Sequence, residues 1–186
     1  MVSLAQLWLP ILLSSVFVFI ASSILHMVIK FWHTPDYKGF SNEDEVAAAL
    51  RKGTNGAGMY NIPFCTPESM KDPSMQDKFK TGPVGQVVLR QPGPMNLGSF
   101  LGQWFGYCLV VSLLAAFIGI HVMGAGTPYK HVFGVIGLST FLAYGLGSVP
   151  NAIWWGHPWK SQVKHLVDGA IYAGLTAGTF GWLWPH

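Results

Sequence analysis

Four stretches of this chain are long and apolar enough to cross a membrane, and they constrain its fold more than any other feature. Each exceeds the roughly 20 apolar residues that a transmembrane helix needs. The predicted spans are residues 7–29, 98–122, 132–154 and 162–184. Only 10% of the residues are charged, whereas soluble domains carry about 25%. The sequence therefore predicts a single all-α integral membrane domain over residues 1–186.

A polar loop over residues 30–97 separates the first two spans and is too long to be a simple connector. Residues 41–53 carry acids at one end and bases at the other, which predicts a helix capped by Ser41 and ended by Gly53. A second helix is predicted over 73–80, with Asp72 as its N-cap and a proline in the first position. The short apolar run 84–90 fits either a strand or an interfacial segment. The loop is thus expected to be partly helical.

Small residues recur every four positions on the second and fourth spans, a pattern that allows close helix packing in membranes. The residues in these stripes are Gly98, Gly102, Gly106, Ala170, Gly174 and Gly178. The fourth span has small residues on two faces, which predicts that it packs against two neighbours.

Basic residues are strongly biased towards one side of the predicted membrane. With four spans, the polar loop and the connector between spans three and four share a side that holds ten of the eleven bases. The other side holds only Lys130. The positive-inside rule therefore predicts a cytoplasmic loop, with both termini outside.

Asp168 is the only acidic residue outside the polar loop, and it lies one helical turn after His165. An ionisable residue inside a membrane helix is a functional candidate. One interpretation gives Asp168 a structural hydrogen bond to Asn151 or Trp155; another gives it a proton- or ligand-binding role. The candidates for that role are Asp168, His165, Asn151, His157 and His26.

Four histidines share the cytoplasmic side and could hold a metal ion or a haem: His26, His33, His157 and His165. No two of them show a local ligand spacing such as His-x-x-x-His, so a site would depend on tertiary proximity. No cofactor is required by the sequence.

Several classes of function lack support in the sequence. Cys65 lies in the polar loop and Cys108 in a span, so a disulfide between them is not expected. There is no nucleophile–base motif and no phosphate loop, which argues against a hydrolase or transferase. A net charge of +3 gives no indication of nucleic-acid binding.

Four short stretches carry a family resemblance. The stretch from Asp168 to Tyr172, followed by Ala177 to Trp184, resembles the last helix of small four-helix bacterial membrane proteins of the domain-of-unknown-function type. Gly82–Gly85 and Gly102–Cys108 are similar to a subset of them. The resemblance implies a multi-pass protein of the bacterial inner membrane and supplies no activity or cofactor.

The leading functional expectation is a non-catalytic accessory or structural subunit of a larger bacterial membrane complex, for example an energy-transducing one. Its partners would be the lipid bilayer and other membrane subunits or a second copy. The first alternative is a small homodimeric transporter or ligand-binding protein that uses Asp168 and nearby histidines. The second is a redox membrane protein with haem or metal at those histidines.

Overall fold

The computed structural model describes residues 2–186 and divides into two compact units, which we describe separately. The first, called the helical unit, contains the chain up to Tyr37 together with Asn96–Ala152 and Pro158–His186. The second, called the loop unit, contains Lys38–Met95 and Ile153–His157. The polar loop of the sequence thus forms a compact unit of its own.

Three helical stretches are long and apolar enough to cross a membrane: Leu4–Val28, Leu97–Val122 and Tyr129–Trp155. Their apolar windows have mean hydropathies of 2.2, 2.1 and 1.7. They coincide with the first three predicted spans. The fourth predicted span is also helical, as α8 (Trp159–Leu183), but its polar first half leaves it outside this group.

The first span is a composite rather than one regular helix. It begins with a 3₁₀ turn (Leu4–Leu7), continues as α1 (Trp8–Ser23) and ends in a π-helical segment (Ile24–Val28). Ser3 starts it through a capping box with Gln6, in which each side chain accepts from the other residue's backbone N–H. The chain then continues as a short helix α2 (Lys30–His33) and a 3₁₀ turn (Thr34–Asp36).

The second and third spans differ in regularity. α5 (Leu97–Val122) is unbroken, and Asn96 caps it by accepting from the Ser99 N–H. The third span comprises α6 (Tyr129–Tyr144), a 3₁₀ turn (Leu146–Ser148) and α7 (Val149–Trp155). The third span is therefore interrupted at Gly145, five residues before Pro150.

A close backbone approach explains the break at Gly145. A Cβ atom added to Gly169 of α8 would lie 2.6 Å from the Gly145 Cα. The absence of a side chain at Gly169 allows this approach, because a Cβ there would collide with the Gly145 backbone, whereas a Cβ on Gly145 would meet the Phe141 ring of its own helix at 2.8 Å.

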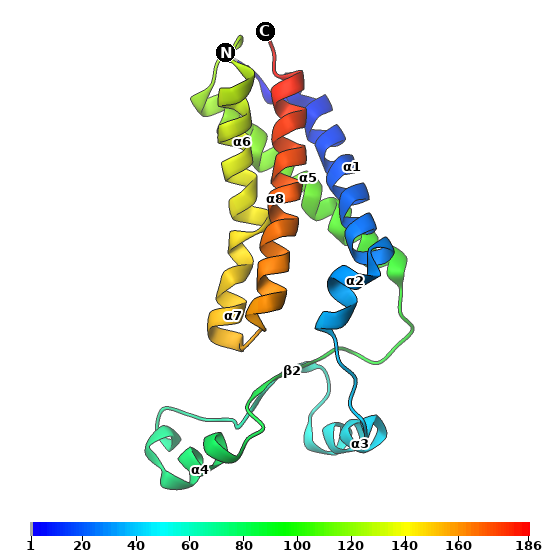
Figure 1. Ribbon diagram of the computed structural model, residues 1–186, viewed down its shortest axis with the longest axis vertical. Coiled ribbons are helices and arrows are strands. Elements are labelled where there is room, and N and C mark those ends of the chain that lie inside the picture. The colour runs from blue at the N-terminus through cyan, green and yellow to red at the C-terminus, as the bar shows by residue number, and fades with distance from the viewer. Residues whose placement is uncertain (1) are drawn as a thin grey trace. The chain divides into compact units, whose positions relative to one another are not determined.

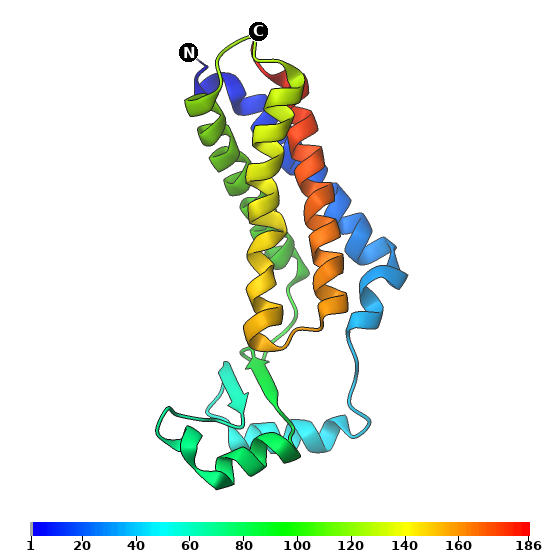
Figure 2. The ribbon, with the colours of Figure 1, turned by 60° about the vertical axis from the view of Figure 1, so that its left-hand side comes forward.

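The long helices of the helical unit pack side by side in a closed ring (Figures 1 and 2). In this ring α8 packs against α6 and α1, and α5 packs against α1 and α6. The prediction that the fourth helix packs on two faces is confirmed. Both termini lie at the same end of this unit (Figure 2).

The closest helix contacts do not involve the glycines predicted for packing. A Cβ added to Gly119, Gly169 or Gly181 would lie within 3 Å of a neighbour. By contrast, a Cβ at Gly102, Gly106 or Gly174 would meet nothing within 4 Å, Gly98 faces only Asn96, and Gly178 meets Tyr129 at 3.7 Å. Ala170 is exposed. The predicted stripes are therefore largely open on the surface of the chain.

The loop unit contains two helices and a two-stranded antiparallel sheet. Its elements are α3 (Glu43–Gly53), β1 (Gly58–Ile62), α4 (Pro73–Thr81) and β2 (Gly85–Leu89), with a 3₁₀ turn at Ser69–Lys71. Both predicted helices are present, and the run 84–90 is a strand. Within Lys38–Met95, Met75 is the only hydrophobic side chain that is buried.

Of the two N-caps predicted in the loop unit, one is confirmed and one is wrong. Asp72 caps α4 as predicted, accepting from the Ser74 N–H at 2.8 Å. The prediction for Ser41 was wrong: Asn42 occupies the N-cap position of α3, and its side chain instead donates to Glu45. Gly53, predicted to end this helix from a position just beyond it, is instead its last residue, and Thr54 is the C-cap.

Candidate functional site

Four side chains with metal-ligating atoms converge in the helical unit: His26, His33, His165 and Asp168. One ligand atom from each lies within 4.8 Å of the other three. The cluster joins the end of the first span and α2 to the second and third turns of α8. His26 is exposed, His165 is half-buried, and His33 and Asp168 are buried. We call these four residues the histidine–aspartate cluster.

His26 lies in the π-helical segment that ends the first span. Such segments are rare and are frequent at functional sites, because the extra residue per turn redirects a side chain. The His26 Nδ1 lies 3.0 Å from the Ser22 carbonyl oxygen, which can only accept. Nδ1 therefore carries the proton and Nε2 has the lone pair that a metal ion requires.

His33 lies between two carboxylates. Its Nε2 is 2.6 Å from Asp168 Oδ2, and its Nδ1 is 3.3 Å from Asp36 Oδ2. A carboxylate on the far nitrogen of a histidine is the usual second partner of a metal ligand, since it fixes the ring and its tautomer. His33 and His26 thus both have Nδ1 engaged by an acceptor, and His33 Nε2 faces Asp168 of the cluster.

Asp36 is held in turn by Lys164 of α8, whose Nζ lies 2.6 Å from Asp36 Oδ1. Lys164 also donates to the Trp32 carbonyl oxygen. The hydrogen bond from Lys164 lowers the pKa of Asp36; partial burial opposes this and the bond to His33 adds to it. Asp36 is therefore a stable anion behind His33.

Asp168 is 2% exposed and has both carboxylate oxygens engaged. Trp32 Nε1 donates to Oδ1 at 2.8 Å, while Oδ2 faces His33. The partners expected from the sequence, Asn151 or Trp155, were wrong: the partners come from α2, more than 130 residues away in the chain. The tryptophan bond leaves Oδ2 as the oxygen available to the cluster.

The three imidazole rings are stacked. The His26 and His33 ring centroids are 4.3 Å apart with planes at 15°, and those of His33 and His165 are 5.2 Å apart at 23°. Face-to-face rings at these separations leave no space for a porphyrin between two axial histidines. A single ion is the better match for the cluster.

The structure brings together only part of the set predicted from the sequence. His157 belongs to the loop unit, and Asn151, in α7, is not part of the cluster. Trp32, Asp36 and Lys164 were missed. Spacing could have indicated two of them, because Asp36 follows His33 by three residues and Lys164 precedes Asp168 by four, which places each pair on one helical face.

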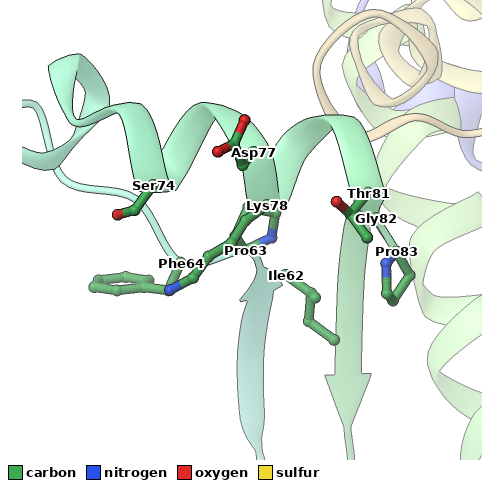
Figure 3. A pocket seen from close by; sticks show the side chains of 9 residues that line it. All are labelled: Ile62, Pro63, Phe64, Ser74, Asp77, Lys78, Thr81, Gly82 and Pro83. Carbon is green, nitrogen blue, oxygen red and sulfur yellow. The ribbon is translucent and has the colours of Figure 1, made fainter.

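The loop unit has a separate hollow of about 560 Å³ between the end of β1 and α4 (Figure 3). Its only charged lining residues are Asp77 and Lys78. It brings together no group of metal ligands, and no nucleophile beside a base, among the residues that line it. The histidine–aspartate cluster is therefore the stronger candidate.

Comparisons with known proteins do not identify a family for this chain. No family model matches the chain, and no curated protein or solved structure is significantly similar to it.

Proposed function

We propose that this protein is a multi-pass membrane protein that binds a first-row transition-metal ion at the histidine–aspartate cluster. The observation that carries the proposal is the convergence of four ligand atoms within 4.8 Å. Two of the three histidines also have Nδ1 engaged by an acceptor, which is the usual arrangement of a metal-ligating histidine. Imidazole and carboxylate ligands suit zinc, iron, nickel and copper.

Zinc fits this ligand set best. Three histidine nitrogens and one carboxylate oxygen make four donors, the coordination number that zinc favours in proteins. Trp32 engages the other carboxylate oxygen, so Asp168 would bind through Oδ2 alone. Zinc–ligand distances of about 2.0–2.1 Å place tetrahedral donors about 3.3 Å apart. Loading would therefore bring the more distant ligand atoms closer than their 4.8 Å limit, and would replace the 2.6 Å hydrogen bond between His33 Nε2 and Asp168 Oδ2 with a wider spacing.

The membrane topology that accompanies this proposal has α8 as a fourth spanning helix. Its packing against α6 and α1 supports this assignment, as does the engagement of Lys164 and Asp168 by partners in α2 and the following turn. The bias of basic residues supports a cytoplasmic loop unit, with both termini across the bacterial inner membrane. The cluster would then face the cytoplasmic side.

The decisive experiment is metal analysis of the full-length protein purified without a histidine tag. We expect about one zinc ion per chain, and competition with a chromophoric chelator should give its affinity. His26→Ala and His165→Ala should each reduce occupancy by at least tenfold. His121→Ala is the matched control, because His121 bonds only to its own helix, at the Phe117 carbonyl. Metal-free protein that also fails to bind added zinc, iron, nickel or copper would refute the proposal.

A second proposal concerns partners. The open glycine surfaces at Gly102, Gly106 and Gly174 support association with other membrane subunits or with a second copy of the chain. Native mass measured after gentle extraction tests this role. A particle with stoichiometric partners or a dimer would support it, whereas a monomer at membrane-like protein densities would exclude it.

A further inference from the structure

The segment between the first span and the loop unit has very little hydrophobic anchorage. From Ile24 to Tyr37 the only buried side chain is His33. Phe31, an apolar residue of the segment, is 79% exposed on the surface of the protein. Segments with few buried apolar contacts open at low free-energy cost, so this one has the low local stability of a switch element.

Polar contacts to α8 are what hold the segment in place. Trp32 and His33 bond to Asp168, and Asp36 bonds to Lys164. Each of these contacts belongs to the cluster or touches one of its ligands. The segment therefore docks through the same groups that would bind the metal ion.

The backbone provides a hinge on the near side of the segment. The π-helical turn ends at Val28, and Ile29 adopts a non-helical conformation with φ −85° and ψ 69° before α2 begins. A break of this kind allows α2 to turn as a body relative to the first span. On its far side, the segment passes directly into the loop unit at Lys38.

We propose that metal binding acts as a latch that holds residues 29–37 against α8. It thereby limits the length of flexible chain between the first span and the loop unit. The inference rests on the proposed metal site and assigns it a regulatory role. Two ligands, His26 and His33, belong to the first span and the segment, and the other two belong to α8. One ion bound to all four can form its full set of bonds only while the segment is docked.

Mass action sets the size of the effect. A ligand that binds only the docked state favours it by a factor of 1 + [L]/Kd, which is about 100-fold at a free metal concentration of about 100 Kd. In the undocked state, the nine residues 29–37 could extend by about 30 Å at roughly 3.3–3.6 Å per residue. Because the docked helix and 3₁₀ turn already span part of this length, metal binding would shorten the tether of the loop unit by less than the fully extended length.

Hydrogen–deuterium exchange on the full-length protein in lipid nanodiscs tests the latch. With zinc at about 100 times its Kd, we expect amide exchange in peptides covering residues 29–37 to slow by about 100-fold relative to chelator-treated protein. Peptides from the middle of α5 should not change. His26→Ala, which removes an exposed ligand without leaving a cavity, and His165→Ala should abolish the effect at the same zinc concentration, while His121→Ala should retain it.

The same samples separate failure of the latch from failure of the metal site. Stoichiometric zinc binding with unchanged exchange at residues 29–37 would overturn the latch and leave the metal site intact. Protein that binds no metal would overturn both. Slowed exchange that persists in both ligand variants would show that zinc acts elsewhere, and would also overturn the latch.

Discussion

The two ends of the helical unit differ in the kind of side chain that they bury. At the end that holds the termini, the large buried side chains are apolar and include Leu7, Ile136, Phe180 and Trp184. At the other end, they include His33, Gln162 and Asp168. Burying ionisable groups costs free energy that an apolar core does not. We therefore expect the apolar end to contribute most of the folding stability and the polar end to contain the functional site.

The largest expected effect is at the apolar end. Phe180 is fully buried, so Phe180→Ala should lower the free energy of unfolding by about 3–5 kcal/mol through lost contacts and a cavity. Reversible unfolding in mixed micelles measures this change. Leu113→Ala, at a position that is 46% exposed, is the control and should cost much less. The stoichiometry of zinc binding by folded Phe180→Ala protein should be normal, and its loss would show that the two ends are not independent.

A substitution beside the cluster tests the close approach of α6 and α8. Gly169→Ala would place a methyl group against the Gly145 backbone and should destabilise the protein by about 1–3 kcal/mol. Gly174→Ala is a matched control on the same helix, where a Cβ meets nothing within 4 Å. It should be neutral or slightly stabilising, because alanine favours helices over glycine. Equal costs at both positions would contradict the packing described here.

At the polar end, Asp36 tests the partner behind a proposed ligand. Asp36→Asn removes the carboxylate on His33 Nδ1 and should weaken zinc affinity by about 10–100-fold, the usual effect of losing such a partner. Chelator competition measures the change. Asp77→Asn removes an exposed acid of the loop unit and should leave affinity unaltered. An Asp36→Asn protein with wild-type affinity would mean that His33 does not ligate through Nε2.

The smallest effect concerns the loop unit, which relies on local contacts. The hydrogen bond from the Ser74 backbone N–H lowers the pKa of Asp72 below its ordinary value of 3.8. A lowered folded-state pKa means that the carboxylate stabilises α4 above about pH 4, and that this contribution is lost as pH falls through the folded-state pKa. An NMR titration of the Ser74 amide should therefore give a midpoint below 3.8. A midpoint at or above that value would contradict the cap.

The helices were predictable from sequence because hydrophobic length and local capping signals determine them. Asp72 and the proline that follows it, for example, specify the start of α4 without reference to the rest of the chain. β1 was missed because its strand character depends on pairing with β2, which lies more than 20 residues later. The π-helical turn at Ile24–Val28 also has no local sequence signal.

The candidate site was predictable in its residue types but not in its geometry. His26, His33, His165 and Asp168 were identified because they are polar residues at the ends of apolar spans. Their convergence depends on how α2 folds back onto α8 after Ile29, which no local pattern specifies. For the same reason, His157 could not be separated from the true members of the cluster by sequence alone.

The apolar end of the helical unit also has an electrical consequence. A charge that crosses the whole membrane gains or loses about 2.3 kcal/mol per 100 mV of potential. In the proposed topology the histidine–aspartate cluster lies at one end and Leu7, Ile136 and Phe180 fill the other, so an ion that bound there from the polar end would traverse little of that field. Metal occupancy should therefore report the concentration of the ion on one side of the membrane and be insensitive to the membrane voltage.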